Sequence, residues 1–416
     1  MLSSKLMSVL GNEDSKEARR AENLIKNATR VVETLGEMKG AAMKVGQMLS
    51  LHDGLLSPEV VAVLRSLQRE APKVPFEVML DEIRGELDDF DGLFEDLEPE
   101  AFAAASIGQV HLGTLKDGRR VAVKIQYPLI EEIIRADLKN LRTILKSLLA
   151  MFSEVDFAPI WLEVRDRLLE ELDYIHEAEN TRRMARLHKD VPEIVIPGVV
   201  EEASTKRVLT MEFVEGIPPE EACSARYDQE LKNLWGANLF NFQFRGLLVH
   251  RFLHADPNLS NFAFLEDGRI VVYDFGCVKR IPRKLAVGYA DLLIAAHEGR
   301  KEDMPQILLE LGVYKEDGTP LAGELTDPYY DLFAEVLRED PPYTFGEDEE
   351  LYDKLFDLGL SNWMEAKDIR FPRHIIFIDR SLGGHFGNLS KLDATAPWRD
   401  LVRENAEAIR RRAIPK

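Results

Sequence analysis

The stretch that decides the fold reads His254-Ala255-Asp256-Pro257-Asn258-Leu259-Ser260-Asn261, and Asp274-Phe275-Gly276 follows it. Asn261 lies five residues after Asp256, and Asp274 lies thirteen residues after Asn261. A catalytic carboxylate, a metal-binding amide and a metal-binding carboxylate occur in this order in phosphoryl-transfer sites. We therefore expect Asp256 to orient the attacking hydroxyl or water, and Asn261 and Asp274 to ligate magnesium.

Two upstream fragments complete this pattern. Val121-Ala122-Val123-Lys124 is a short β-rich run that ends on the lysine expected to hold the α- and β-phosphates of ATP. Glu177 lies between that run and the catalytic loop, and it is the best candidate to pair with Lys124 and orient it, because a buried lysine needs a charge partner. Four fragments in the correct order predict one pocket for ATP and Mg²⁺.

An alanine-rich segment precedes the lysine. Ala103, Ala104, Ala105 and Ser106 occupy the frame of a glycine-rich phosphate loop, but alanine replaces its first two glycines. Each Cβ holds the backbone farther from the phosphates, so this loop should grip nucleotide differently. Residues 109–115 and 119–126 predict a hairpin with the lysine on its second strand. The alternative interpretation of the alanines is a helix start.

Helical periodicity dominates elsewhere. Apolar residues recur at three- and four-residue steps from Ala21 to Met38, which predicts a long amphipathic helix in a helical extension. A second helix is expected from about Ala158 through Ala178. On spacing alone, Glu171 and Asp173 indicate a solvated helix face rather than a site.

Composition narrows the partners and the compartment. The 416 residues carry a formal charge of −20 and are 45% hydrophobic, which indicates an acidic protein with room for two cores and makes nucleic acid an improbable partner. The two cysteines, Cys223 and Cys277, form no metal-type spacing and indicate a reducing compartment, so we expect a cytoplasmic location.

No apolar run approaches the roughly 18 residues that span a bilayer. Residues 1–10 could form a short helix that touches a membrane surface, or a frayed terminus.

The chain resembles the UbiB-type atypical kinase-like proteins, also called the aarF-domain-containing kinase family, which is linked to ubiquinone biosynthesis. Three motifs carry the resemblance: Lys44-Val45-Gly46-Gln47 fits Lys-x-Gly-Gln, Ala103 to Ser106 fits the alanine-rich loop, and Glu171-Leu172-Asp173 fits Glu-x-Asp. In that family the N-terminal extension folds over the active site, where its lysine meets the acids of the Glu-x-Asp motif. The resemblance implies a regulatory role for Lys44, Gln47, Glu171 and Asp173.

One loop departs from that family. Its catalytic loop more often reads His-Ala-Asp-Pro-His-Pro-Gly-Asn, whereas Asn258-Leu259-Ser260 stands before Asn261 here. Asp256 and Asn261 are both present, so we expect the metal chemistry to be retained. The departure affects the shape of the loop.

The expected fold is α+β, a protein-kinase-like two-lobe fold with a helical N-terminal extension packed over the active site. Its expected parts are a helical extension over 1–95, an N-lobe over 96–215 with the alanine-rich loop and the nucleotide lysine, and a mainly helical C-lobe over 216–416.

The leading functional hypothesis is an atypical kinase-like ATPase that binds Mg-ATP and supports isoprenoid quinone biosynthesis or lipid handling. Its expected partners are nucleotide, a membrane surface or lipid-like quinone precursor, and quinone-biosynthesis proteins. No Ala-Pro-Glu follows Asp274-Phe275-Gly276, which weakens the case for a regular protein kinase. The alternatives are a protein or small-molecule kinase and a non-catalytic nucleotide-binding scaffold.

Overall fold

A computed structural model describes residues 74–152, 157–347, 369–370 and 372–411. These residues form two compact units. The first contains residues 74–118, Ala122–Asp173 and Thr205–Val208, and the second contains Arg119–Val121, Tyr174–Ser204 and the described residues from Leu209 onward. Lys44, Gln47 and the long helix expected within 21–38 lie outside the described residues.

The first unit begins with two helices and a hairpin. Its early elements are α5 (Phe76–Glu86), α6 (Phe90–Leu93), β1 (Phe94–Ala105), β2 (Gly108–Leu115) and β3 (Arg120–Gln126). Together with β5 (Val208–Glu212) these strands form a sheet in the order β1-β2-β3-β5. The hairpin predicted over 109–115 and 119–126 is therefore confirmed, with Lys124 on its second strand.

Strand β1 lies at one edge of this sheet, and no strand was predicted ahead of the hairpin. Its pairing with β2 is irregular between Leu97 and Ala101, around Pro99. Proline cannot donate a backbone hydrogen bond, so an irregular edge strand is the place where a sheet accepts it.

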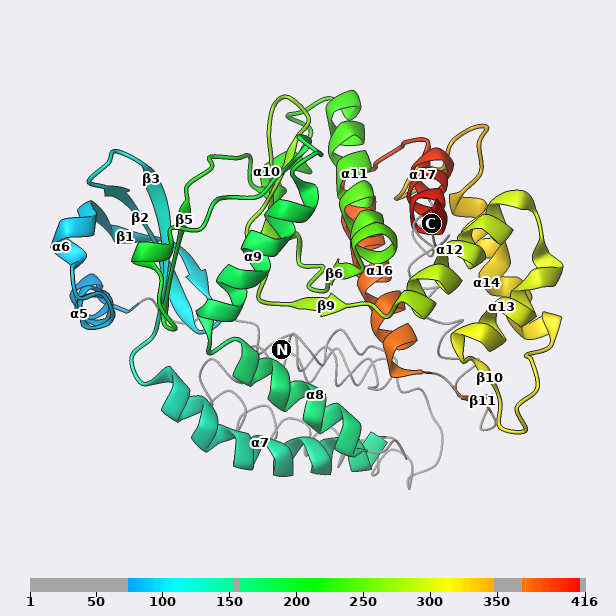
Figure 1. Cartoon of the computed structure of the whole chain (residues 1–416), viewed down its shortest axis with the longest axis horizontal. Coiled ribbons are helices and arrows are strands. Elements are labelled where there is room, and N and C mark those ends of the chain that lie inside the picture. The colour runs from blue at the N-terminus through cyan, green and yellow to red at the C-terminus, as the bar shows by residue number, and fades with distance from the viewer. Residues whose placement is uncertain (1–73, 153–156, 348–368, 371, 412–416) are drawn as a thin grey trace, which may run out of the picture. The chain divides into compact units, whose positions relative to one another are not determined.

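Helices α7 (Ile130–Phe152) and α8 (Phe157–Glu170) close the first unit and lie side by side (Figure 1). Ile130, Ile134 and Leu141 are buried on one stripe of α7. This apolar stripe packs α7 against the rest of the unit, as expected of an amphipathic helix.

The second unit is mainly helical, with short strands around the predicted catalytic segments (Figure 1). Its early elements are α9 (Tyr174–His188), β4 (Ile194–Val195), α10 (Pro219–Ala222), α11 (Gln229–Phe244), β6 (Phe252–His254), β7 (Phe262–Phe264), β8 (Ile270–Val272) and β9 (Val278–Arg280). Its later elements are α12 (Arg283–Glu298), α13 (Met304–Leu311), β10 (Tyr314–Lys315), α14 (Gly323–Val336), β11 (Ile369–Arg370), α16 (Arg373–Lys391) and α17 (Trp398–Arg411).

Aromatic side chains form the core of the second unit. Phe240 of α11 packs on Trp398 of α17, with ring centroids 4.9 Å apart, and Phe345 lies 5.0 Å from the same indole. The indole nitrogen of Trp398 donates to the carbonyl of Tyr343 at 2.7 Å, so the buried ring leaves no unsatisfied donor. This core holds α11, α16 and α17 together.

Helix α11 leads directly to the predicted catalytic loop. Its N-cap Asp228 accepts a hydrogen bond from the amide of Leu231 at 2.8 Å. At its other end the chain passes through a π-helical turn, Arg245–His250, and Arg251 then takes a left-handed conformation with φ 52°. The chain thereby reverses into β6, which carries His254.

The structure contains both helices and strands, which confirms the predicted α+β class at the level of secondary-structure content. Neither Cys223 nor Cys277 is part of a disulfide bond. The two-lobe arrangement and the packing of an extension over the site stay predictions.

Candidate functional site

The loop after β6 is held by its own side chains. Asp256 Oδ1 accepts from the amide of Asn258 at 3.2 Å, and Asn258 Oδ1 accepts from the amide of Ser260 at 3.1 Å. A 3₁₀ turn follows over Leu259–Asn261, and Leu259 is buried in the core of the second unit. The segment that departs from the family pattern therefore forms a capped turn with an apolar anchor.

The predicted metal ligands meet at one end of a hairpin. Strands β7 and β8 pair with Phe262 opposite Val272, and the amide of Tyr273 donates to the carbonyl of Asn261 at 3.0 Å. This register puts Asn261 and Asp274 at the same end of the hairpin. The Asn261 amide nitrogen donates to the carbonyl of Asp256 at 3.4 Å, which leaves the amide oxygen as the atom that would ligate magnesium.

The chemistry of this pair fits magnesium. An amide oxygen and a carboxylate are hard ligands, and Mg²⁺ typically takes one or two carboxylates together with phosphates and water. In the part of the chain that the structure describes, no three His, Cys, Asp or Glu side chains are grouped to hold a metal by themselves. Asn261 and Asp274 could hold such an ion together with phosphate and water oxygens.

His254 holds the segment around Asp274. Its Nε2–H donates to the carbonyl of Asp274 at 2.7 Å, and its ring packs edge-on against Phe275 at 5.7 Å. Burial lowers the pKa of His254 below its usual value, so the ring is neutral at pH 7. This geometry gives His254 a packing and hydrogen-bonding role within the loop.

The carboxylate of Asp274 turns back on its own loop. Asp274 Oδ1 accepts from the amide of Gly276 at 2.9 Å, while Phe275 is fully buried between them. The buried phenyl ring anchors the segment, and the short glycine turn brings the backbone amide within reach of the carboxylate. These contacts fix the direction of the side chain of a predicted metal ligand.

Helix α9 docks on the same segment. Glu177, in the first turn of α9, is 5% exposed, and its Oε2 lies 3.5 Å from the position that a Cβ on Gly276 would take. Asn180, one turn further on, donates its side-chain amide to the carbonyl of Phe275 at 3.1 Å. Asn180 was not predicted as a site residue, although its i+3 spacing from Glu177 on a predicted helix was an available signal.

The first unit holds the other half of the predicted site. Ala103 and Ala105 pair with Val110 and Gly108, so the alanines end a strand, and a two-residue turn leads back into β2. The helix-start interpretation of the alanines was therefore wrong. A Cβ on Gly108 would collide with the backbone carbonyl of Ile125, next to Lys124 on β3, which explains why glycine is needed there.

The Glu-x-Asp motif reaches the alanine-rich loop within the first unit. Ser106 Oγ donates to Glu171 Oε2 at 3.0 Å. Glu171 and Asp173 lie in a turn between α8 and α9, since α8 ends at Glu170 and α9 begins at Tyr174. The single helix predicted from about Ala158 through Ala178 was thus wrong.

The predicted site residues divide between the two units. Lys124, the alanine-rich loop and the Glu-x-Asp acids belong to the first unit, whereas Glu177, Asp256, Asn261 and Asp274 belong to the second. The pairing of Lys124 with Glu177 therefore stays a prediction. So does the regulatory role of Lys44 and Gln47, which lie outside the described residues.

These elements define a protein of the kinase-like class. The chain matches the ABC1 atypical kinase-like domain over residues 66–308 and belongs to that family, which confirms the UbiB-type resemblance.

Several proteins are similar over most of this chain. It is 30% identical over 388 residues to the mitochondrial atypical kinase coq-8 of Caenorhabditis elegans, covering 91% of this chain and 50% of that protein. It is 37% identical over 277 residues to the mitochondrial atypical kinase COQ8B of Danio rerio, covering 66% and 44% respectively. The rat COQ8B is 33% identical over 384 residues, covering 91% and 71%. The chain thus spans about half the length of the first two relatives.

A solved structure is also similar. The complex of Rv3197 with erythromycin from Mycobacterium tuberculosis has a TM-score of 0.68 and 28% sequence identity, and the match covers 96% of this chain and all of that one.

Among the described residues, no helix is both long and apolar enough to cross a membrane.

Proposed function

We propose that the chain is an atypical kinase-like ATPase that uses Mg-ATP in support of isoprenoid quinone biosynthesis or lipid handling. The β7–β8 register is the observation that carries the phosphoryl-transfer part, because it brings Asn261 and Asp274 to one end of a hairpin beside the Asp256 loop. Phosphoryl transfer depends mostly on positioning and charge neutralisation, which this arrangement can supply.

The proposed role of each residue follows the motif to which it belongs. Asp256 orients the attacking hydroxyl or water, and Asn261 and Asp274 ligate the magnesium that neutralises the phosphates. Lys124 holds the α- and β-phosphates, and Glu177 pairs with Lys124 and orients it. The loop from Ala103 to Ser106, with Ala104 exposed near its tip, covers the nucleotide.

The two-lobe arrangement with an extension over residues 1–95 is part of the same proposal. Lys44 and Gln47 would come from that extension and meet Glu171 and Asp173. The hydrogen bond from Ser106 to Glu171 links the acidic motif to the loop that would cover ATP. A change at the acids would then reach the nucleotide through the loop.

We favour an ATPase over a protein kinase on the ground of how easily a peptide substrate could reach the cleft. An extension across the cleft would obstruct a peptide, and the Ala-Pro-Glu that follows the metal segment in protein kinases is missing from the sequence after Gly276. The names of the COQ8 relatives favour a place in coenzyme Q metabolism. A lipid-like quinone precursor, a membrane surface and proteins of quinone biosynthesis are therefore the proposed partners.

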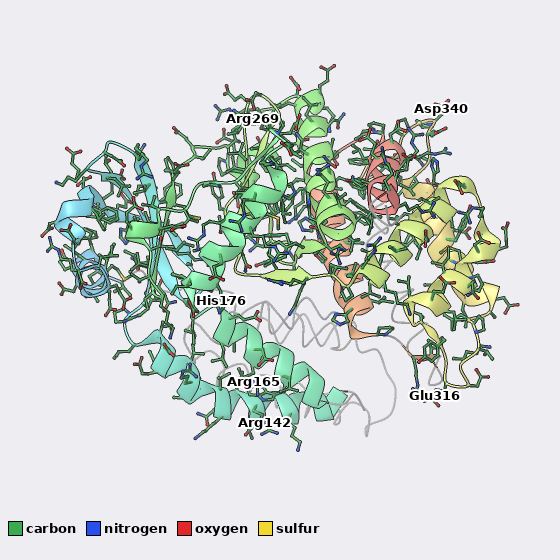
Figure 2. All side chains as sticks on the ribbon, in the orientation of Figure 1. Arg142, Arg165, His176, Arg269, Glu316 and Asp340 are labelled. Atoms are coloured by element: carbon green, nitrogen blue, oxygen red, sulfur yellow. The ribbon has the colours of Figure 1, made fainter. Side chains whose placement is uncertain are left out.

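Magnesium-dependent release of phosphate from ATP tests the proposal. Asp274→Asn is expected to reduce release by at least about a hundredfold, because the metal loses its carboxylate. Asp267→Asn is the matched control: Asp267 lies in the turn at the opposite end of the same hairpin, where it binds Arg269. Arg269 is labelled in Figure 2. The control variant should retain the wild-type rate.

Two extensions of the phosphate-release assay identify the substrate class. Stimulation by anionic liposomes or by a quinone-like phenol would favour the quinone assignment, whereas radiolabelled phosphate on a protein or small molecule would favour a kinase. ATP binding without release of phosphate under any condition would overturn the ATPase proposal in favour of a nucleotide-binding scaffold.

A further inference from the structure

One face of α16 is packed against the catalytic loop. Ser381, Gly384, His385 and Asn388 follow one another at steps of three, one and three residues, so they lie on a single face of this helix. Figure 1 shows α16, in orange, passing beside α11. We call these four residues the loop platform.

The platform fixes the backbone on both sides of Asp256. Asn388, which is 3% exposed, donates its side-chain amide to the carbonyl of Pro257 at 2.7 Å. Ser381 Oγ donates to the carbonyl of His254 at 3.1 Å. Gln243 of α11 donates to that same carbonyl at 3.3 Å and to Ser381 Oγ at 2.9 Å. Two carbonyls that flank Asp256 are therefore held by buried side chains of α11 and α16.

The remaining platform residues set the distance between helix and loop. A Cβ on Gly384 would collide with the ring of Pro257, lying 2.6 Å from its Cβ and closer still to its Cγ. His385 packs on His254 and Phe262, with ring centroids 6.1 and 5.8 Å away. The loop thus rests on α16 by direct backbone contact at Gly384 and by ring packing one residue further on.

We propose that the loop platform positions Asp256 for phosphoryl transfer, so that α16 acts as a support of the catalytic loop from more than 120 residues downstream. None of the platform residues is expected to touch nucleotide or metal; they act through the Pro257 and His254 carbonyls. Misplacing a catalytic group by about 1 Å can cost two orders of magnitude in rate, so such supports govern turnover more than binding. The role in turnover rests on the proposed function, whereas the support of the loop does not.

Two glycines of α16 provide a matched pair of variants. Gly384→Ala must displace the Pro257 ring, whereas Gly387→Ala on the same helix places its Cβ in open space. Alanine favours helix at both positions, so only displacement of the loop separates the variants. Gly384→Ala is expected to lower kcat for phosphate release at least about tenfold with little change in the KM for ATP, and Gly387→Ala to retain the wild-type kcat.

A second pair of variants removes hydrogen bonds without adding volume. Asn388→Ala is expected to raise deuterium uptake by residues 255–261 about tenfold, since it removes the donor to Pro257. Asn405→Ala is the control, because Asn405 is equally buried on α17 but binds Asn241 and Leu401 instead. Hydrogen exchange in the full chain reports the loop directly and needs no activity.

The outcomes separate the two proposals. Faster exchange in the loop and lower kcat in Gly384→Ala and Asn388→Ala, with both controls at wild-type values, would support the platform. Unchanged exchange in the loop, equal effects in the controls, or faster exchange with an unchanged kcat would overturn it. If the wild-type protein released no phosphate, the ATPase proposal would fail and hydrogen exchange alone would decide whether α16 supports the loop.

Discussion

His385 should make the second unit sensitive to acid. Its side chain is 4% exposed, it packs against His254 and Phe262, and neither of its ring nitrogens has a hydrogen-bond partner in the described part of the chain. Burial, and secondarily the neighbouring His254, lowers the pKa of His385 to about 3. The folded protein therefore keeps this imidazole neutral over a pH range in which an unfolded chain protonates it.

The sign and size of the effect follow from proton linkage. Between the usual pKa of about 6.5 and the folded value, the unfolded chain binds one proton more than the folded chain, so stability falls as the pH falls. From pH 7 to pH 5 the loss attributable to His385 is about 2 kcal/mol, at about 1.4 kcal/mol for each pH unit below 6.5. That is a sizeable part of the 5 to 15 kcal/mol that typically stabilises a domain.

Urea unfolding of the full chain at pH 7, 6 and 5, followed by tryptophan fluorescence, measures this loss. We expect His385→Leu to weaken the pH dependence by about 2 kcal/mol over that range, because leucine cannot titrate. His176→Leu on α9 is the control, since the His176 side chain is 69% exposed and keeps its contact with water when the chain folds (Figure 2). Equal pH dependence in wild type and His385→Leu would refute the reasoning.

Two further predictions concern the first unit. Ser106→Ala should raise deuterium uptake in residues 103–107 about tenfold, because the loop loses its hydrogen bond to the Glu171 carboxylate; unchanged uptake would show that this bond does not hold the loop. Gly108→Ala should cost about 2 kcal/mol or more in urea unfolding, since its Cβ meets the Ile125 backbone, whereas Gly85→Ala on α5 has open space and should cost nothing; equal stabilities of the two variants would contradict the packing argument.

Local patterns in the sequence were enough to predict the hairpin and the order of the phosphoryl-transfer motifs. The β-rich runs around Lys116-Asp117-Gly118 predict β2 and β3 because hairpins form from residues close in the chain. The spacing of Asn261 and Asp274 similarly reflects one short hairpin that returns the chain to the same end. Such features depend on neighbours within about twenty residues.

Other features could not be predicted because their causes are local exceptions or distant contacts. Helical periodicity continues across Glu171 and Asp173, yet the structure breaks the helix there and turns Glu171 toward Ser106. Tertiary contacts can override helix propensity in this way. The support of Pro257 by Asn388 joins residues 131 positions apart and has no periodic signature in the sequence.

In the altered catalytic loop, local contacts shape the middle of the loop and distant contacts hold the backbone beside Asp256. Asn258 caps the 3₁₀ turn and Leu259 anchors it in the core, so the residues that differ from the family pattern shape the loop from within. Pro257, which the family pattern retains, meets Gly384 and Asn388 of α16. The middle of the loop can therefore change its sequence while the backbone beside Asp256 keeps its support, which explains how Asp256 and Asn261 can remain usable in a loop of different composition.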